Sequence, residues 1–297
     1  MPGGFAAQPE NRKGRQESQS APREDSPMKV PALLFSLALF TGVAANAGAQ
    51  RRTIPIPSGT IVDLSYPFDS STVYWPTAEA FHLEKDFEGT TDKGYYYSAY
   101  RYSAAEHGGT HIDAPVHFAQ GKNSVDAIPL EQLIAPGIVV DVTRQCAQNP
   151  DYLVTAIDLQ NWERRNGRIA DGTIVFLRTG FGRSYPDPKR YLGTDQRGAA
   201  AVAGLHFPGL HPKAALWLTQ NRKIGAIGLD TASIDYGQST LFESHRTLFA
   251  SNIPALENVA NLDRLPVRGF SVIALPMKIK AGSGGPLRIV AIVSARR

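Results

Sequence analysis

The sequence has 297 residues, of which 42% are hydrophobic and 20% are charged, with a formal net charge of +4 and a single cysteine. This composition excludes an intrinsically disordered protein, a small disulfide-stapled domain and a protein with many membrane spans. The small net charge indicates no nucleic-acid-binding surface, and the length suits one large domain or two small ones.

Residues 1–27 are rich in glycine, proline, glutamine, serine and charged residues. A segment with so few apolar side chains cannot bury enough surface to offset the entropy lost on ordering. We therefore expect residues 1–27 to be a disordered extension, or a stretch upstream of a true translation start at Met28.

Residues 28–49 have the parts of a secretory signal peptide. Met28 and Lys29 precede an apolar run that extends to Ala45, and the run is followed by small residues up to Ala49. A transmembrane anchor or a buried helix is the alternative, but the run is short for a membrane span. We expect cleavage that leaves residues 50–297 as one domain in the bacterial periplasm or outside the cell, with no stable membrane insertion afterwards.

Seven short runs rich in β-branched residues predict strands in the mature chain. They are Thr60–Leu64, Tyr95–Tyr102, Gly137–Val142, Thr173–Leu177, Ile224–Leu229, Phe270–Leu275 and Leu287–Val293. Four segments between them predict helices, namely Thr155–Asn166, Pro212–Asn221, Phe242–Ser251 and Pro254–Leu262. The mixture indicates an α/β domain, although helices do not follow every strand as a simple doubly wound sheet would require.

The single cysteine, Cys146, cannot form an internal disulfide. It lies in the polar stretch 143–148, which we expect to be a loop, and no histidine is near it in sequence. We therefore expect a passive thiol rather than a nucleophile.

Three of the seven histidines fall in one eleven-residue segment, from His107 to His117. Two glycines after His107 and a proline at position 115 make a helix improbable, so we expect a loop that curves around a small object. Asp113 follows His111 by two residues, and in an extended chain both side chains point the same way. A lone histidine would more often be an ordinary core or surface residue, but this group suits zinc, manganese or iron.

His117 stands four residues beyond Asp113 and has two alternative roles. As a further ligand it would close the site and make it structural. Near the ion but not bound to it, its imidazole could move a proton to or from an activated water at neutral pH.

The pattern His-x-Gly-Thr-His-x-Asp-x-Pro-x-His of this segment resembles the signature of the cyclase family, which includes bacterial kynurenine formamidases and isatin hydrolases. The resemblance extends across nearly all of the mature chain. It is also carried by Asp63-Leu64-Ser65, Tyr74-Trp75-Pro76, Phe207–Leu210, Ala214–Leu218, Gly228–Asp235, His245 with Glu257-Asn258, and Leu275 to Arg288.

The resemblance implies a site in which His107, His111 and Asp113 bind one divalent ion, zinc or manganese. In members with two ions per subunit, Asp113 would bridge to a second ion held by His245 and Glu257. In members with one ion, His245 and Glu257 would lie beside the substrate or near the ion. The sequence has the required residue at each of these ligand positions, so both arrangements remain open.

The resemblance also implies a fold and an assembly. The fold is a single α/β domain with a mixed β-sheet or barrel-like core and outer helices, of the swivelling β/β/α type. The assembly is a homodimer or homotetramer, and the partner is a small-molecule substrate.

We expect hydrolysis of a carbon–nitrogen amide bond in a small formamide, lactam or cyclic imide by metal-activated water, with His117 as the general acid/base. Trp75, Phe68 and Phe81 are candidate walls of the substrate pocket, or equally parts of the apolar core. The alternatives are a periplasmic metal- or solute-binding protein without turnover, which would not require His117, and a ring-forming or dehydrating cyclase.

Two further aspartates are expected to be structural, and two further histidines are not expected to be ligands. Asp230 and Asp235 flank a predicted strand end, where aspartates commonly cap turns. His206 and His211 bracket a Pro-Gly loop, and we do not expect either to bind the ion.

Overall fold

The computed structural model describes residues 58–294. The predicted extension at 1–27 and the predicted signal peptide at 28–49 lie outside the described residues, so both stay predictions. Among residues 58–294, none of the helices combines the length and the hydrophobicity needed to cross a membrane.

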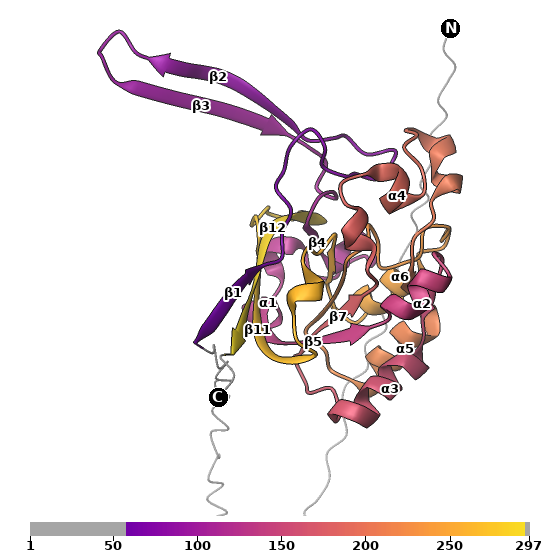
Figure 1. Cartoon of the computed structure of the whole chain (residues 1–297). Coiled ribbons are helices and arrows are strands. Elements are labelled where there is room, and N and C mark those ends of the chain that lie inside the picture. Colours follow the sequence, from indigo (N-terminus) through magenta and orange to yellow (C-terminus); the bar gives the residue numbers. More distant parts are fainter. Residues whose placement is uncertain (1–57, 295–297) are drawn as a thin grey trace, which may run out of the picture. The chain divides into compact units, whose positions relative to one another are not determined.

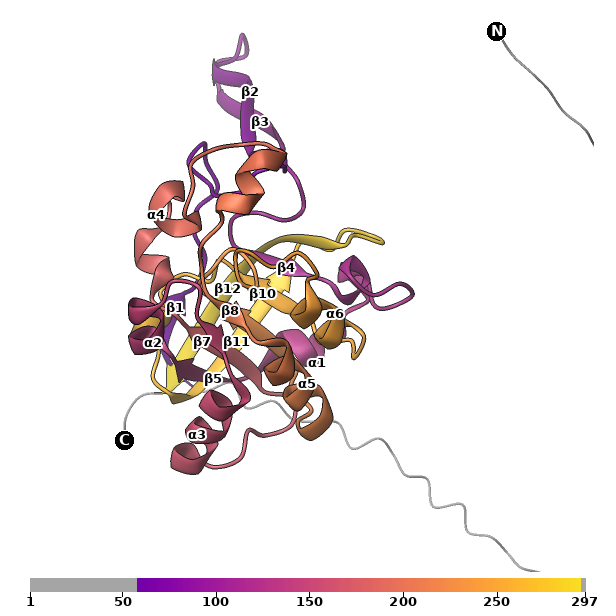
Figure 2. The same cartoon turned by 90° about the vertical axis from the view of Figure 1, so that its right-hand side faces the viewer.

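Eight strands form one mixed sheet that closes on itself (Figures 1 and 2). These strands are β1 (Gly59–Asp63), β4 (His111–Asp113), β5 (Ile134–Asp141), β7 (Ile174–Arg178), β9 (Ala226–Leu229), β10 (Ala255–Glu257), β11 (Arg268–Pro276) and β12 (Gly284–Ser294). Their order is β1-β12-β11-β5-β7-β9-β10-β4, and β4 also pairs with β12. The pairing of β4 with β12 closes seven strands into a ring, to which β1 is added outside. The expected mixed, barrel-like core is confirmed.

Strands β5, β7, β9 and β10 run parallel, whereas β1, β4, β11 and β12 pair antiparallel. Alternate residues of β7 enter two different apolar clusters. Ile174 and Phe176 pack with side chains of β11 and β12, while Val175 and Leu177 pack with those of the helices. Because successive side chains of a strand point to opposite faces, β7 is buried on both sides and reads as a continuous apolar run.

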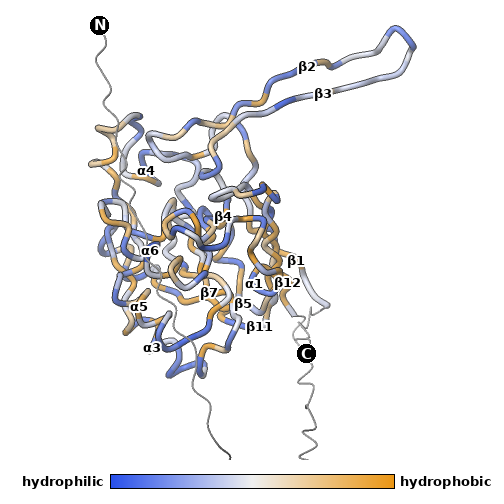
Figure 3. The backbone as a smooth tube through the Cα atoms, turned by 180° about the vertical axis from the view of Figure 1, so that it is seen from behind, coloured by the Kyte–Doolittle hydropathy of each residue, from blue (hydrophilic) through white to orange (hydrophobic). Residues whose placement is uncertain are grey.

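The helices include α1 (Leu130–Leu133), α2 (Thr143–Gln148), α3 (Ala156–Asn166), α4 (Pro188–Leu192), α5 (Pro212–Asn221) and α6 (Glu243–Phe249). Of these, α2, α3, α5 and α6 pack on the outer face of the parallel strands (Figure 1). Thr155 and Asp158 form a capping box at the start of α3. At the start of α5, the His211 side chain accepts a hydrogen bond from the Lys213 amide. Hydrophobic stretches gather in the ring and these helices (Figure 3).

Two further strand pairs lie outside the ring. Strands β6 (Leu153–Val154) and β8 (Gly209–Leu210) form a small parallel pair. Strands β2 (His82–Thr90) and β3 (Tyr96–Ser103) form a long antiparallel hairpin that extends away from the ring (Figure 1). Almost every residue of the hairpin is exposed.

All seven predicted strands are present, as are the predicted helices that became α3, α5 and α6. The helix predicted at Pro254–Leu262 is wrong. Residues Ala255–Glu257 form β10, because buried backbone here pairs with β9 and β4, and Asn258 and Asn261 then adopt a positive φ that ends any regular element.

The loop predicted around Cys146 is also wrong, because residues Thr143–Gln148 form α2. The thiol of Cys146 is buried, and this burial raises its pKa to about 12. A thiol held in its neutral form is a poor nucleophile, so the expected passive role is confirmed.

Candidate metal centre

Two glycines let the histidine-rich segment turn tightly before it enters the sheet. A Cβ on Gly108 would stand 2.1 Å from ring atoms of Tyr74, with whose backbone Gly108 forms a bridge. Gly109 has a φ of +53°, and a Cβ there would meet the Phe68 ring at 2.7 Å. The curved loop expected here is therefore confined to residues 107–110, and His111 already belongs to β4.

Strand β4 lies between β10 and β12, and its register brings distant site residues together. Glu257 of β10 lies opposite His111, and Ala255 lies opposite Asp113. On the other side, Gly284 of β12 lies opposite Asp113. The extended chain sends His111 and Asp113 to the same face, as expected, and their atoms Nε2 and Oδ1 are 3.0 Å apart.

His111 is buried with its two ring nitrogens in different surroundings. Nδ1 hydrogen-bonds to the carbonyl oxygen of Gly109 at 3.0 Å, and since a carbonyl only accepts, Nδ1 carries the hydrogen. Nε2 is buried and has no hydrogen-bond partner within residues 58–294. It lies 3.5 Å from a carboxylate oxygen of Glu257. Burial alone would lower the pKa of His111, but the carboxylates of Asp113 and Glu257 outweigh it and raise that pKa.

His245 reaches the same point from α6. Its Nε2 lies 3.2 Å from Asp113 Oδ2 and 3.1 Å from Glu257 Oε1, and its Nδ1 lies 2.6 Å from Asp235 Oδ2. Burial would lower the pKa of His245, yet hydrogen bonds to these three carboxylates raise it well above the usual value. The imidazole therefore holds three acidic side chains together by charge.

The pKa values of the two innermost carboxylates, Asp113 and Glu257, shift in opposite directions. Burial would raise the pKa of Asp113, but the charge and hydrogen bond of His107 and the close imidazoles of His111 and His245 lower it well below the usual value. For Glu257, burial and the neighbouring charge of Asp113 raise the pKa. Two buried carboxylates this close need positive charge between them, which protons or a cation can supply.

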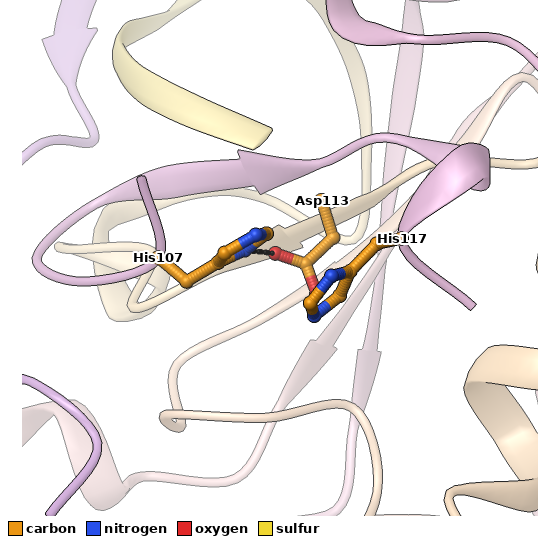
Figure 4. A group of neighbouring side chains, drawn as sticks. All are labelled: His107, Asp113 and His117. Carbon is orange, nitrogen blue, oxygen red and sulfur yellow. Dashed lines mark hydrogen bonds and ion pairs between the residues drawn. The ribbon is translucent and has the colours of Figure 1, made fainter. Parts of the chain in front are cut away.

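His107 and His117 complete the group at its open side. His107 Nδ1 lies 2.6 Å from Asp113 Oδ1, and the ring of His117 stacks on that of His107 with centroids 3.9 Å apart. Figure 4 shows both histidines converging on Asp113, from the turn before β4 and the short helix after it. Burial, the largest effect, and the nearby histidines lower the pKa of His117 to about 4. The imidazole of His117 is therefore neutral at pH 7.

The six polar residues predicted for the site line one cavity of about 270 Å³. Its apolar walls include Trp75, Phe118 and Phe242, with ring centroids of the last two 5.1 Å apart. Phe68 and Phe81, predicted as pocket walls, are not among the lining residues. They pack against each other at 5.7 Å, and Phe68 lies behind Gly109.

Sequence reasoning missed Phe118 and Phe242 as lining residues. Phe118 directly follows the motif, and that adjacency was the available signal. Phe242 adopts a φ of +48°, which is unusual for a bulky side chain and has no sequence signature.

The donor set fits a divalent metal ion. Two groups of three residues each bring a ligand atom within 4.8 Å of the others: His107, Asp113 and His117, and His111, Asp113 and Glu257. The buried, unpartnered Nε2 of His111 is the atom that an ion would satisfy. Nitrogen and oxygen donors together suit zinc or manganese.

The two aspartates expected to be structural differ from each other, and the two histidines not expected to be ligands lie outside the cavity. Asp230 accepts hydrogen bonds from the amides of Thr179, Gly180 and Gly182, as a turn-capping aspartate does. Asp235 instead contacts His245 directly, so it is part of the site's surroundings. His206 pairs with Asp151 and His211 caps α5, and neither lines the cavity.

Known proteins resemble this chain over most of its length. The family model described as "Putative cyclase" matches residues 62–236. An isatin hydrolase of Roseibium aggregatum is 32% identical over 245 residues, which cover 76% of this chain and 90% of that protein. A kynurenine formamidase of Polaromonas naphthalenivorans is 27% identical, covering 83% of this chain and 94% of that protein. A solved isatin hydrolase bound to the product analogue thioisatinate superposes with a TM-score of 0.72 at 30% identity, covering 79% of this chain and 92% of its own.

Proposed function

Since the chain belongs to the cyclase family and is a metal-dependent hydrolase of non-peptide carbon–nitrogen amide bonds, we propose that its substrate is a small aromatic lactam of the isatin type. The similarity to isatin hydrolases exceeds that to kynurenine formamidases. The observation that carries the proposal is the cavity itself, which six convergent polar side chains line together with an aromatic wall.

His107, His111 and Asp113 would hold one zinc or manganese ion. His245 and Glu257 would hold a second ion bridged by Asp113, or would lie beside the substrate where one ion is bound. A divalent ion supplies Lewis acidity, which polarises a carbonyl oxygen and acidifies water at neutral pH. In every arrangement Asp113 is the central residue, because His107, His111 and His245 all lie within 3.2 Å of its carboxylate.

His117 would move the proton that the reaction requires. Being neutral at pH 7, its imidazole can accept a proton from the attacking water. Water adds to the amide carbonyl carbon, the carbon–nitrogen bond breaks, and the nitrogen takes the proton that His117 carries. A lactam opens to an amino acid in this way, with no enzyme nucleophile consumed.

The aromatic side chains would orient the substrate ring. Trp75, Phe118 and Phe242 form a connected aromatic wall of the cavity, and Phe118 packs directly against His117 and His245. Aromatic rings favour offset or edge-to-face packing with a flat substrate. A planar bicyclic lactam fits this wall better than a flexible chain does.

The experiment is a panel of amides with the metal-loaded protein. Isatin, N-formylkynurenine and a cyclic imide are assayed by following the loss of the amide. We expect isatin to have the highest kcat/KM. A higher kcat/KM for N-formylkynurenine would contradict the lactam assignment while leaving amide hydrolysis in place. Release of a dehydrated or cyclised product would contradict hydrolysis.

We also propose export and self-association. The apolar run after Lys29 supports cleavage of residues 28–49 and a periplasmic or secreted location, which the N-terminal sequence of protein from a bacterial periplasm tests. The exposed hairpin supports a homodimer or homotetramer, because an isolated two-stranded hairpin is at best marginally stable in water.

A further inference from the structure

A serine and a carboxylate hold the ring of His107 through the nitrogen that does not face Asp113. His107 Nε2 lies 2.9 Å from the hydroxyl oxygen of Ser283. That hydroxyl donates to Glu106 Oε2 at 2.6 Å, and the same oxygen accepts from the amides of Ser283 and Gly284. His107, Glu106 and Ser283 are partly exposed to solvent, and Gly284 is buried.

This network fixes which nitrogen of His107 carries a hydrogen. A serine hydroxyl has one proton to donate, and here Glu106 receives it. The oxygen of Ser283 can therefore only accept from His107, which places a hydrogen on Nε2. Nδ1 is the atom that faces Asp113, 2.6 Å from Oδ1. It would be the nitrogen that binds the ion, once the hydrogen that it shares with that carboxylate has left.

The backbone around Ser283 also leaves the ring little room to turn. Gly284 lies opposite Asp113 in the sheet, and the carbonyl oxygen of Ser283 accepts from the Ala114 amide at 2.8 Å. A Cβ on Gly284 would stand 2.5 Å from Cε1 of His107. The imidazole thus packs edge-on against the start of β12, which β4 holds in place.

The geometry points to Glu106 and Ser283 as positioning residues that prepare His107 Nδ1 to bind the metal ion. This role rests on the proposed function, because it takes His107 to be a metal ligand. Partners of this kind raise metal affinity by removing the cost of orienting the ligand and selecting its tautomer. Neither residue needs to touch the substrate.

The test is metal affinity measured by competition with a chelator, on full-length protein stripped and titrated with zinc. Ser283→Ala is expected to weaken zinc binding about 10- to 100-fold, whereas Ser283→Thr, which keeps the hydroxyl, restores most of it. Ser124→Ala is the matched control, since Ser124 also donates to a carboxylate at 2.6 Å but touches no site residue. Its affinity should stay within about twofold of wild type.

A second readout follows the tautomer itself. In zinc-loaded protein with nitrogen-15-labelled histidine, NMR of wild type should show one His107 ring with its hydrogen on Nε2. In Ser283→Ala, the Nε2 hydrogen should exchange faster with solvent, or the His107 ring should show a mixture of tautomers. Glu106→Gln retains an acceptor oxygen without charge, so its zinc affinity should fall between those of wild type and Ser283→Ala.

Three results would overturn the assignment. The first is that zinc affinity and the His107 spectrum are unchanged in Ser283→Ala. The second is that Ser124→Ala loses as much zinc affinity as Ser283→Ala does. The third, which concerns Glu106 alone, is a wild-type zinc affinity in Glu106→Gln. Failure of the proposed function has a different signature, namely that wild type itself binds no zinc or manganese.

Discussion

Three histidines of the cavity share one arrangement. In His107, His111 and His245, one ring nitrogen is held by a fixed oxygen, and the other lies within 3.2 Å of Asp113. The fixed oxygens are a serine hydroxyl, a backbone carbonyl and a carboxylate, so the chain prepares the same geometry in three chemically different ways. Metal-binding histidines are usually oriented by such partners.

This arrangement predicts that metal binding releases protons. Burial lowers the pKa of His245, but its three carboxylate partners outweigh burial and raise that pKa well above 6.5 in the metal-free protein. The ion competes with that proton, so apparent zinc affinity should rise with pH from ~6.5 upward. Titration calorimetry in buffers of different ionisation enthalpy measures the released protons. An affinity that does not change between about pH 6.5 and 8.5 would argue against His245 as a ligand.

The same raised pKa determines how stability varies with pH when no metal is present. A histidine whose pKa is higher in the folded protein stabilises it fully below the unfolded value of ~6.5. That contribution is lost as the pH rises through the folded-state pKa of His245. The Tm of metal-free protein should therefore fall on the alkaline side, and less so in His245→Gln.

His117 is expected to matter for turnover and not for metal binding. Replacing it by asparagine should lower kcat about 10²- to 10⁴-fold, the usual contribution of a positioned general acid/base. Metal content, measured by elemental analysis, should be unchanged. The control is His206→Asn, because His206 is exposed and pairs with Asp151 away from the cavity. Loss of metal in His117→Asn would assign His117 to the ligands instead.

At the scale of elements, the site depends on two strands of three residues each. Strands β4 and β10 carry His111, Asp113 and Glu257, and β4 closes the ring by pairing with both β10 and β12. Neither β4 nor β10 was predicted, because so short a strand is defined by its partners and not by its own periodicity. The longer β-branched strands and the capped helices were predicted because their signals are local.

The turn before β4 gives a prediction of its own. Gly108→Ala places a methyl group 2.1 Å from the Tyr74 ring, so the turn or the ring must shift. We expect a loss of about 1–3 kcal/mol in the free energy of unfolding and weaker metal binding. Gly285→Ala is the control, since its methyl group would meet its nearest neighbour at 3.4 Å. Equal stability of the two variants, measured by denaturant unfolding, would show that Gly108 is not needed for packing.

At the scale of the whole molecule, the motif residues predicted the site's location better than its walls. All six polar candidates line one cavity. They could be predicted because both the family motif and the metal-ligand chemistry are visible in the residue types of the sequence. Phe242 reaches the same cavity from a distant segment, and only the fold brings it there. Phe68 and Phe81, chosen for their aromatic character alone, lie elsewhere.

The hairpin of β2 and β3 should determine self-association. It carries seven exposed large side chains, namely Leu83, Phe87, Tyr95, Tyr96, Tyr97, Tyr100 and Tyr102. Such a concentration of exposed aromatic surface is typical of an interface. Replacing Tyr96 and Tyr100 by serine should shift the molar mass measured by light scattering toward that of the monomer. A monomeric wild-type protein would refute the proposed oligomer.

Hydrolysis of a small amide by this chain should require a divalent ion held in the cavity. The most direct measurement is the rate of isatin ring opening by protein that has been stripped with a chelator and then titrated with manganese or zinc. We predict negligible turnover without metal and recovery that saturates at one or two equivalents, with no recovery in Asp113→Asn. Undiminished turnover by the stripped protein, or full recovery in Asp113→Asn, would contradict the account.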